Sequence, residues 1–227
     1  GDNMAKSTII KDFAGGRVSV EIALKQLKVL LAEFDKPEML KWVNAELQGY
    51  DDTDALPEYR VIVGNLVGNF LNYYTKCTHI SIPLKSDAPK ELVEMCSQVR
   101  LYDSLSALRA LTETDREFGR QINALLLPYV QQFSAISMTA LLNATVEFSQ
   151  TQVKNVFSRV ENAVLDVLLL LEKEFGNLDD LDIDLTSKSN DEIQNIASNI
   201  MILLYNDNSI VIGDNNRMKD TSISSAR

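Results

Sequence analysis

The sequence predicts an α+β fold with an N-terminal helical hairpin, a small and mostly antiparallel sheet, a long amphipathic helix and a short strand-like tail. Three observations indicate this class. Apolar residues recur at helical spacing over residues 19–48, and the same spacing returns for six turns over 149–175. Between them, residues 59–84 are rich in Val, Ile, Tyr, Phe and Thr, the residue types that favour strands.

The helical hairpin is predicted from two adjoining segments. Residues 19–34 are expected to form a helix capped by Ser19, with one apolar face made of Val20, Leu24, Leu27, Leu31 and Phe34. A second helix is expected to begin at Pro37, which suits a first helical turn, and to stop at Gly49. Because the link between the two segments is very short, we expect them to pack as an antiparallel pair.

The sheet is predicted mainly from the segment 59–84, which has room for two or three strands before Pro83. Gly64 and Gly68 interrupt it, and glycines inside strand-like sequence indicate a bulge or a close approach of another backbone. The segment 137–148 is also strand-like. These segments together predict a small sheet in the middle of the chain.

Further helices are predicted around and after the sheet. Helical character resumes over 88–99, whereas 104–115 fits a helix or a strand equally well. Residues 119–133 are expected to be helical, with a kink or an end at Pro128.

The clearest predicted element is the helix over 149–175. Its apolar residues hold the spacing of three and four residues, and Leu165, Leu169 and Leu170 add a second apolar face. The C-terminal half of this helix is therefore expected to be buried on two sides, and Gly176 is a suitable stop.

The chain is expected to have four parts. They are a cloning remnant before Met4 with an N-terminal arm (1–12), the α+β domain (13–176), an acidic linker (177–190), and a short helix with a tail (191–227). The tail fits two short strands that could join another sheet edge, although an unstructured tail fits nearly as well. The expected oligomer contacts in the tail are Ile210, Ile212 and Ile223. The end at Arg227 leaves room for an effector region beyond it.

Composition limits the partners that the protein can have. The net charge of −10 is concentrated toward the two ends, and no dense cluster of Lys and Arg stands out, which disfavours non-specific binding to nucleic acid. A local basic strip remains the alternative, formed by Lys76, Lys85, Lys90 and Arg100. The longest apolar run is too short for a membrane span, which needs roughly 20 residues. We therefore expect a cytoplasmic protein whose two cysteines are reduced.

Catalytic chemistry has few candidates in this sequence. His79, the single histidine, lies two residues from Cys77 and from Ser81 on a predicted strand, a poor geometry for a nucleophile and its base. One His and two distant Cys also disfavour a zinc site, and the acidic run at 180–184 lacks the glycine of a calcium loop. No phosphate-binding glycine loop or nucleophile elbow is present. We predict no catalytic, cofactor-binding or metal-binding residue.

One carboxylate-rich turn keeps an enzymatic alternative open. The four acids of this turn could hold Mg²⁺ in a cryptic nuclease or toxin, although solvated acids after a helix stop are the simpler interpretation. These acids are Asp51, Asp52, Asp54 and Glu58.

A long motif spans this turn. Residues 42–60 read WVNAELQGYDDTDALPEYR and resemble the opening of the AbiTii domain of bacterial abortive-infection proteins, in which W-x-x-x-E-L-x-G-Y is followed by an acidic loop and L-P-x-Y-R. The matching residues are Trp42, Asn44, Glu46, Leu47, Gly49, Tyr50, Leu56, Pro57, Tyr59 and Arg60. The helix over 149–175 and the IVIGDNN of the tail are similar to later parts of such proteins, although Val167 stands where the family often has Trp.

The resemblance implies a role in defence against phage, and it assigns no catalytic residues. We expect the motif to act in structure or in an interaction, with Trp42, Val43 and Leu47 buried and Gly49 ending the helix. Glu46 and Arg60 are expected to pair across the corner between helix and sheet. The favoured hypothesis is a module that acts through contacts with itself, with another protein or with a phage component.

Overall fold

The computed structural model describes residues 6–53, 55–113 and 118–205. The chain divides into two compact units, which we describe separately. One unit comprises the described parts of Gly1–Val43 and Asn162–Arg227, and the other comprises those of Asn44–Glu161. Two helices, α3 (Pro37–Gln48) and α7 (Gln150–Phe175), contribute residues to both units.

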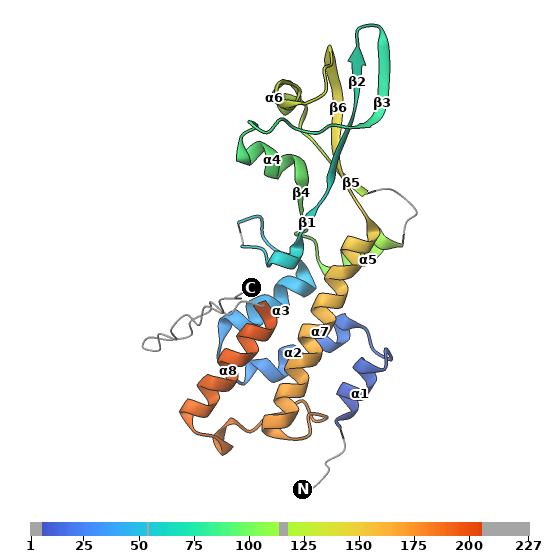
Figure 1. Ribbon diagram of the computed structural model, residues 1–227. Helices are drawn as coiled ribbons and strands as arrows, with labels where there is room; N and C mark the ends of the chain where they lie inside the picture. The colour runs from blue at the N-terminus through green and yellow to red at the C-terminus, as the bar shows by residue number, and fades with distance from the viewer. Residues whose placement is uncertain (1–5, 54, 114–117, 206–227) are drawn as a thin grey trace, which may run out of the picture. The chain divides into compact units, whose positions relative to one another are not determined.

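The first unit is helical (Figure 1). It contains α1 (Thr8–Ala14), α2 (Val20–Ala32), the beginning of α3, the later part of α7, and α8 (Asn190–Tyr205). The Oγ atom of Ser19 accepts a hydrogen bond from the Ile22 N–H, which confirms the predicted cap of α2. The predicted helices over 19–34, 37–48, 149–175 and 191–204 are all present, as is the short link before Pro37.

Two segments of this unit contain more structure than the sequence indicated. Helix α1 lies largely in the expected N-terminal arm, and it buries Ile9, Ile10 and Phe13. The acidic segment after α7 contains the 3₁₀ turn η3 (Leu185–Ser187), and Leu178 and Ile183 are buried. Apolar anchors within the expected arm and linker therefore belong to the core.

The second unit contains two antiparallel sheets. β1 (Val61–Val63) pairs with β4 (Gln98–Arg100), and a four-stranded sheet has the order β3-β2-β6-β5. The strands of the larger sheet are β2 (Asn65–Asn72), β3 (Thr75–Ser81), β5 (Phe118–Gln121) and β6 (Ala140–Phe148). The α+β prediction and the strand assignments over 59–84 and 137–148 are confirmed.

The centre of this sheet requires a glycine, and Gly68 occupies that position. It lies in β2 between β3 and β6, and a Cβ atom at this position would come 2.5 Å from the carbonyl oxygen of Asn143. The register with β3 shifts between Gly68 and Phe70, and the register with β6 shifts between Asn69 and Phe70. The predicted close backbone approach and bulge are both present.

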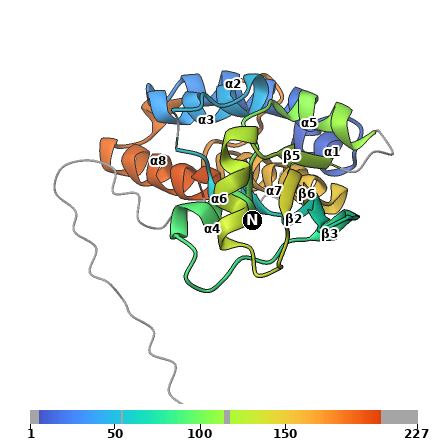
Figure 2. The same ribbon diagram turned by 90° about the horizontal axis from the view of Figure 1, so that it is seen from above.

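Helices α4 (Lys90–Ser97) and α6 (Leu127–Phe133) lie on the same side of the larger sheet (Figure 2). The ambiguous segment 104–115 contains the helix α5 (Leu105–Thr112), capped by the Ser104 hydroxyl. The prediction of one helix over 119–133 was wrong, since the segment holds the end of β5, the 3₁₀ turn η2 (Ala124–Leu126) and α6. Pro128 opens α6 instead of kinking it, because the first turn of a helix needs no N–H there.

Candidate functional site

The AbiTii-like motif builds a buried polar cluster where α3 ends. Glu46 comes from the last turns of α3, and Arg60 closes the 3₁₀ turn η1 (Glu58–Arg60) just before β1. Both side chains have no exposed surface, and the guanidinium Nη2 donates to Glu46 Oε2. The predicted pairing of Glu46 with Arg60 is therefore confirmed, and the pair is fully buried.

Two tyrosines of the motif complete the shell around Glu46. The hydroxyl of Tyr50 donates to Glu46 Oε1 over 2.6 Å, and that of Tyr59 donates to the same oxygen over 2.7 Å. The Glu46 carboxylate thus accepts from two hydroxyls and one guanidinium. A buried carboxylate requires such partners, because leaving it without them would cost several kcal/mol.

Arg60 extends this cluster to the backbone that follows β4. Its Nη1 donates to the carbonyl of Leu101 over 3.2 Å and to that of Asp103 over 2.6 Å. The guanidinium also lies over the ring of Tyr50, 5.0 Å from the centroid. One side chain therefore holds together the end of α3, the turn η1 and the segment 101–103.

The two tyrosines are held in their protonated form. Burial raises the pKa of Tyr50 far above its ordinary value, and the nearby negative charge of Glu46 raises it further. The pKa of Tyr59 is raised for the same two reasons, in the same order. Both hydroxyls therefore remain donors to Glu46 over the whole neutral range.

Gly49 shapes the backbone of this corner. It follows the last residue of α3 with a φ of +102°, a conformation that residues with a Cβ rarely adopt. A Cβ atom here would lie 3.0 Å from the carbonyl oxygen of Tyr102, which accepts the N–H of Tyr50. Gly49 ends the helix as predicted, and it also allows the segment 101–103 to approach.

The other motif residues occupy mostly buried or half-buried positions. Trp42, Val43 and Pro57 are buried, whereas Leu47 and Leu56 are half-buried. Asn44 is also half-buried. The motif therefore supplies apolar packing and internal hydrogen bonds, and its charged pair has no open face for a substrate.

The acidic turn differs from this cluster in its chemistry. Asp51, Asp52 and Glu58 are exposed, and Asp54 is outside the described residues. The N–H and hydroxyl of Thr53 both donate to Asp51 Oδ1 over 3.3 Å, as in a turn closed by its own aspartate. Over the described residues, no three side chains among His, Cys, Asp and Glu are grouped closely enough to hold a metal ion.

The side chains of His79, Cys77 and Cys96 do not form a common site. The His79 side chain is largely exposed, with Nδ1 3.5 Å from Glu147 Oε1. Cys77 is half-buried on β3 and Cys96 is buried on α4, and both are free thiols. Burial raises the pKa of Cys96, which keeps this thiol protonated and unreactive.

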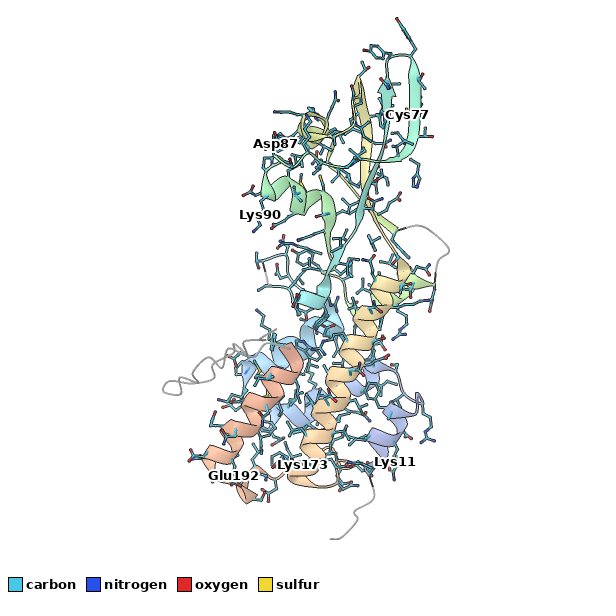
Figure 3. All side chains as sticks on the ribbon, in the orientation of Figure 1. Lys11, Cys77, Asp87, Lys90, Lys173 and Glu192 are labelled. Carbon is cyan, nitrogen blue, oxygen red and sulfur yellow. The ribbon has the colours of Figure 1, made fainter. Side chains whose placement is uncertain are left out.

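The residues of the expected basic strip come from separate segments. Lys76 lies on β3, Lys85 in the loop after it, Lys90 at the start of α4 and Arg100 on β4. Lys90, which Figure 3 labels, approaches Glu94 to 3.6 Å. The carboxylate of Glu94 thus neighbours Lys90, which weakens any attraction for nucleic acid there.

A shallow hollow of about 550 Å³ opens beside α6. Among the residues that the structure describes, Lys85 is the one charged residue that lines it, and its Nζ donates to the carbonyl of Gln132 over 2.9 Å. The remaining lining residues are neutral, namely Pro128, Gln131, Gln132, Ser134, Ala135, Ile136, Ser137 and Met138. Of the described residues that line the hollow, none carries a carboxylate or an imidazole.

Comparison with known families decides the assignment, because the AbiTii family model matches residues 7–197. The chain belongs to the AbiTii family. The matched region extends over parts of both units and includes the whole cluster around Glu46 and Arg60. Membership in AbiTii indicates a role in abortive infection, a form of defence against phage. No curated protein and no solved structure matches the chain.

The residues of this cluster could be predicted from the sequence only in part. The AbiTii motif identified Glu46, Gly49, Tyr50, Tyr59 and Arg60. It gave no sign of the backbone carbonyls of residues 101 and 103, because a carbonyl acceptor has no signature in the sequence.

No described helix of this AbiTii chain has both the length and the apolar character needed to cross a membrane.

Proposed function

We propose that this AbiTii protein acts in phage defence through contacts between protein surfaces rather than through catalysis. The observation that carries the proposal is the buried cluster of Glu46, Tyr50, Tyr59 and Arg60, in which the charged groups of the family motif are occupied with one another. An active site needs groups that can reach a substrate. A motif whose charged pair is fully buried instead preserves a shape that another molecule recognises.

The partner is a second copy of the chain, a host protein or a phage component. Self-association is the first choice, and Ile210, Ile212 and Ile223 of the tail remain its predicted contacts, although they lie outside the described residues. The proposal places the protein in the cytoplasm, where the free thiols of Cys77 and Cys96 are chemically stable.

The proposal is tested by combining a plating assay with a measurement of mass. Cells that produce the full chain should reduce phage plating, and light scattering of the purified protein should give a mass above that of one chain. A chain that ends after Tyr205 should have a lower mass if the tail contributes. A protein that is monomeric at high concentration, with or without residues 206–227, would contradict self-association.

The alternative is a metal-dependent toxin that uses the turn containing Asp51, Asp52, Asp54 and Glu58. The exposure of the three described acids permits ion binding, but no structural observation favours it over solvation. Alanine at all four positions separates the two hypotheses. We expect the quadruple variant to keep full protection, and a loss of protection in a folded variant would support the toxin.

A further inference from the structure

Helix α1 lies beside the C-terminal part of α7 (Figure 1), and its start is bound by residues far along the chain. The N–H and the hydroxyl of Ser7 both donate to Glu172 Oε1, and the same hydroxyl accepts the N–H of Leu178 over 3.0 Å. The Ile9 N–H donates to Asp179 Oδ1 over 3.2 Å. A helix start is usually satisfied by the side chain of the residue before it, but the Ser7 hydroxyl makes no such bond to α1. Two distant carboxylates thus take the place of a local cap.

Both carboxylates are ionised at neutral pH. Burial raises the pKa of Asp179, but its hydrogen bonds, that from the Ile9 N–H first, outweigh burial and the net pKa is lowered. Burial raises the pKa of Glu172 as well, and the bonds from Lys6 and Ser7 again lower the net value. Hydrogen bonds to a charged acceptor are roughly twice as strong as those between neutral groups. The start of α1 is therefore held by strong bonds that involve few groups.

The other end of α1 leads into two glycines. Over the described residues, this end makes only local hydrogen bonds, such as that from the Gly15 N–H to the carbonyl of Lys11, which Figure 3 labels. Gly16 has a φ of +70° and open space around it. The next helix, α2, has a cap of its own in Ser19. A movement of α1 about these glycines therefore leaves the start of α2 intact.

Apolar packing alone does not hold α1 in place. Its buried side chains are Ile9, Ile10 and Phe13. The conformational entropy that the whole segment loses on ordering exceeds what three apolar side chains return. With seven residues, α1 is also shorter than the roughly 12 residues that a helix needs to form in water, so it unfolds when it leaves its place. The bonds to Glu172 and Asp179 therefore decide whether α1 stays docked.

We propose that residues 6–14 form a strap, which opens as one unit while α2 and the later part of α7 stay folded. Its opening uncovers the apolar surface on which Ile9, Ile10 and Phe13 rest. The closed strap is the resting state of the protein, and the open strap is the state that makes contacts with other molecules. This inference rests on the proposed function, because it makes the protein contacts of that function conditional on the opening.

Hydrogen exchange of single amides in the full chain, followed by NMR, tests whether the strap opens. The amides of α1 are expected to share one protection factor, below that of α2. Ser7→Ala removes two buried hydrogen bonds and is expected to speed exchange throughout α1 by about tenfold or more. Asp179→Asn, at an exposed position, should act in the same direction. Ser19→Ala, the matched control at the cap of α2, should leave exchange in α1 unchanged.

Growth of uninfected cells tests whether the strap controls the protein. At equal amounts of folded protein, Ser7→Ala is expected to cause a loss of colonies without phage, because its strap is open more often. Ser19→Ala is expected to cause no such loss. Equal colony counts for these two variants, when exchange in α1 is faster only for Ser7→Ala, would overturn the regulatory role.

Three results of the exchange experiment would overturn the strap itself. They are amides of α1 that exchange only with those of α2, a gradual decrease of protection from Gly16 toward the start of the helix, and an equal effect of Ser7→Ala on both helices. A closed strap in a protein that protects cells overturns this inference and leaves the proposed function intact. A strap that opens in a protein that protects against no phage contradicts the proposed function and not the opening.

Discussion

The guanidinium of Arg60 donates to the carboxylate of Glu46, and neither side chain has any exposed surface. The two residues lie on either side of the backbone corner formed by the AbiTii motif, Glu46 on α3 and Arg60 at the end of η1. Because the pair is buried, its energetics differ from those of a surface salt bridge. A buried pair adds little net stability over apolar residues of the same volume, but the loss of one partner leaves a charge without compensation.

Glu46→Gln should therefore destabilise the protein strongly. It leaves the Arg60 charge buried against two neutral carbonyls and an amide, and we expect the free energy of unfolding to fall by about 3–5 kcal/mol. Urea denaturation followed by circular dichroism measures this. Glu58→Gln makes the same chemical change at an exposed position of the same motif and should alter the value by less than about 0.5 kcal/mol. Equal effects of the two variants would show that burial does not determine how much stability is lost when the carboxylate is replaced.

The two buried tyrosines predict a loss of stability at alkaline pH. Their pKa values are raised in the folded state, so they ionise first in the unfolded chain once the pH exceeds the ordinary tyrosine pKa of about 10. Stability is then complete below pH 10 and should fall above it by about 1.4 kcal/mol per pH unit for each tyrosine. Unfolding measured between pH 8 and 11 tests this. Tyr50→Phe with Tyr59→Phe should reduce this slope, and an unchanged slope would count against the assignment.

Gly49→Ala should cost more than the same change at Gly16. Gly16 has a φ of +70° with open space around it, so alanine there meets only the left-handed strain of about 1 kcal/mol. Gly49 has a φ of +102° and, in addition, the Tyr102 carbonyl 3.0 Å from the new Cβ. Thermal unfolding of both variants compares the two costs. A smaller loss at Gly49 than at Gly16 would show that this corner relaxes freely.

In the helical unit, Glu172 ties the start of α1 to α7. Its Oε1 accepts the N–H and the hydroxyl of Ser7, over 2.6 and 2.7 Å, and its Oε2 accepts from the exposed Lys6. Burial raises the pKa of Glu172, but the hydrogen bonds from Lys6 and Ser7 outweigh it and the net pKa is lowered. Its contribution is thus present above the ordinary glutamate pKa and is lost as the pH falls through the lowered value.

Glu172→Gln is expected to cost about 1–3 kcal/mol at pH 7 and less at acidic pH, once the pH has fallen below the lowered pKa of the wild-type carboxyl. Denaturation at both pH values measures the difference. Glu161→Gln, on an exposed face of α7, serves as the control with little effect at either pH. A cost for Glu172→Gln that is the same at both pH values would rule out the ionised carboxylate as its source.

The sequence predicted those parts of the fold that depend on local pattern. Helices α2, α3 and α7 followed from apolar spacing, and the link of Glu46 to Arg60 followed from opposite charges on either side of a short turn. Helix α1 was missed because it has seven residues and no side-chain cap, so no local signal marks it. The β5 segment was taken for helix because its four residues are stabilised by pairing with β6, which is distant in sequence.

We propose that the AbiTii motif maintains a fold instead of performing chemistry. The most direct test measures phage plating against the amount of folded protein in cells that carry Glu46→Gln, Arg60→Met or Leu105→Ala, the last a packing variant with no part in the motif. We expect protection to depend only on the amount of folded protein, so that all three variants lie on one curve. A Glu46→Gln protein that is fully folded and gives no protection would contradict it.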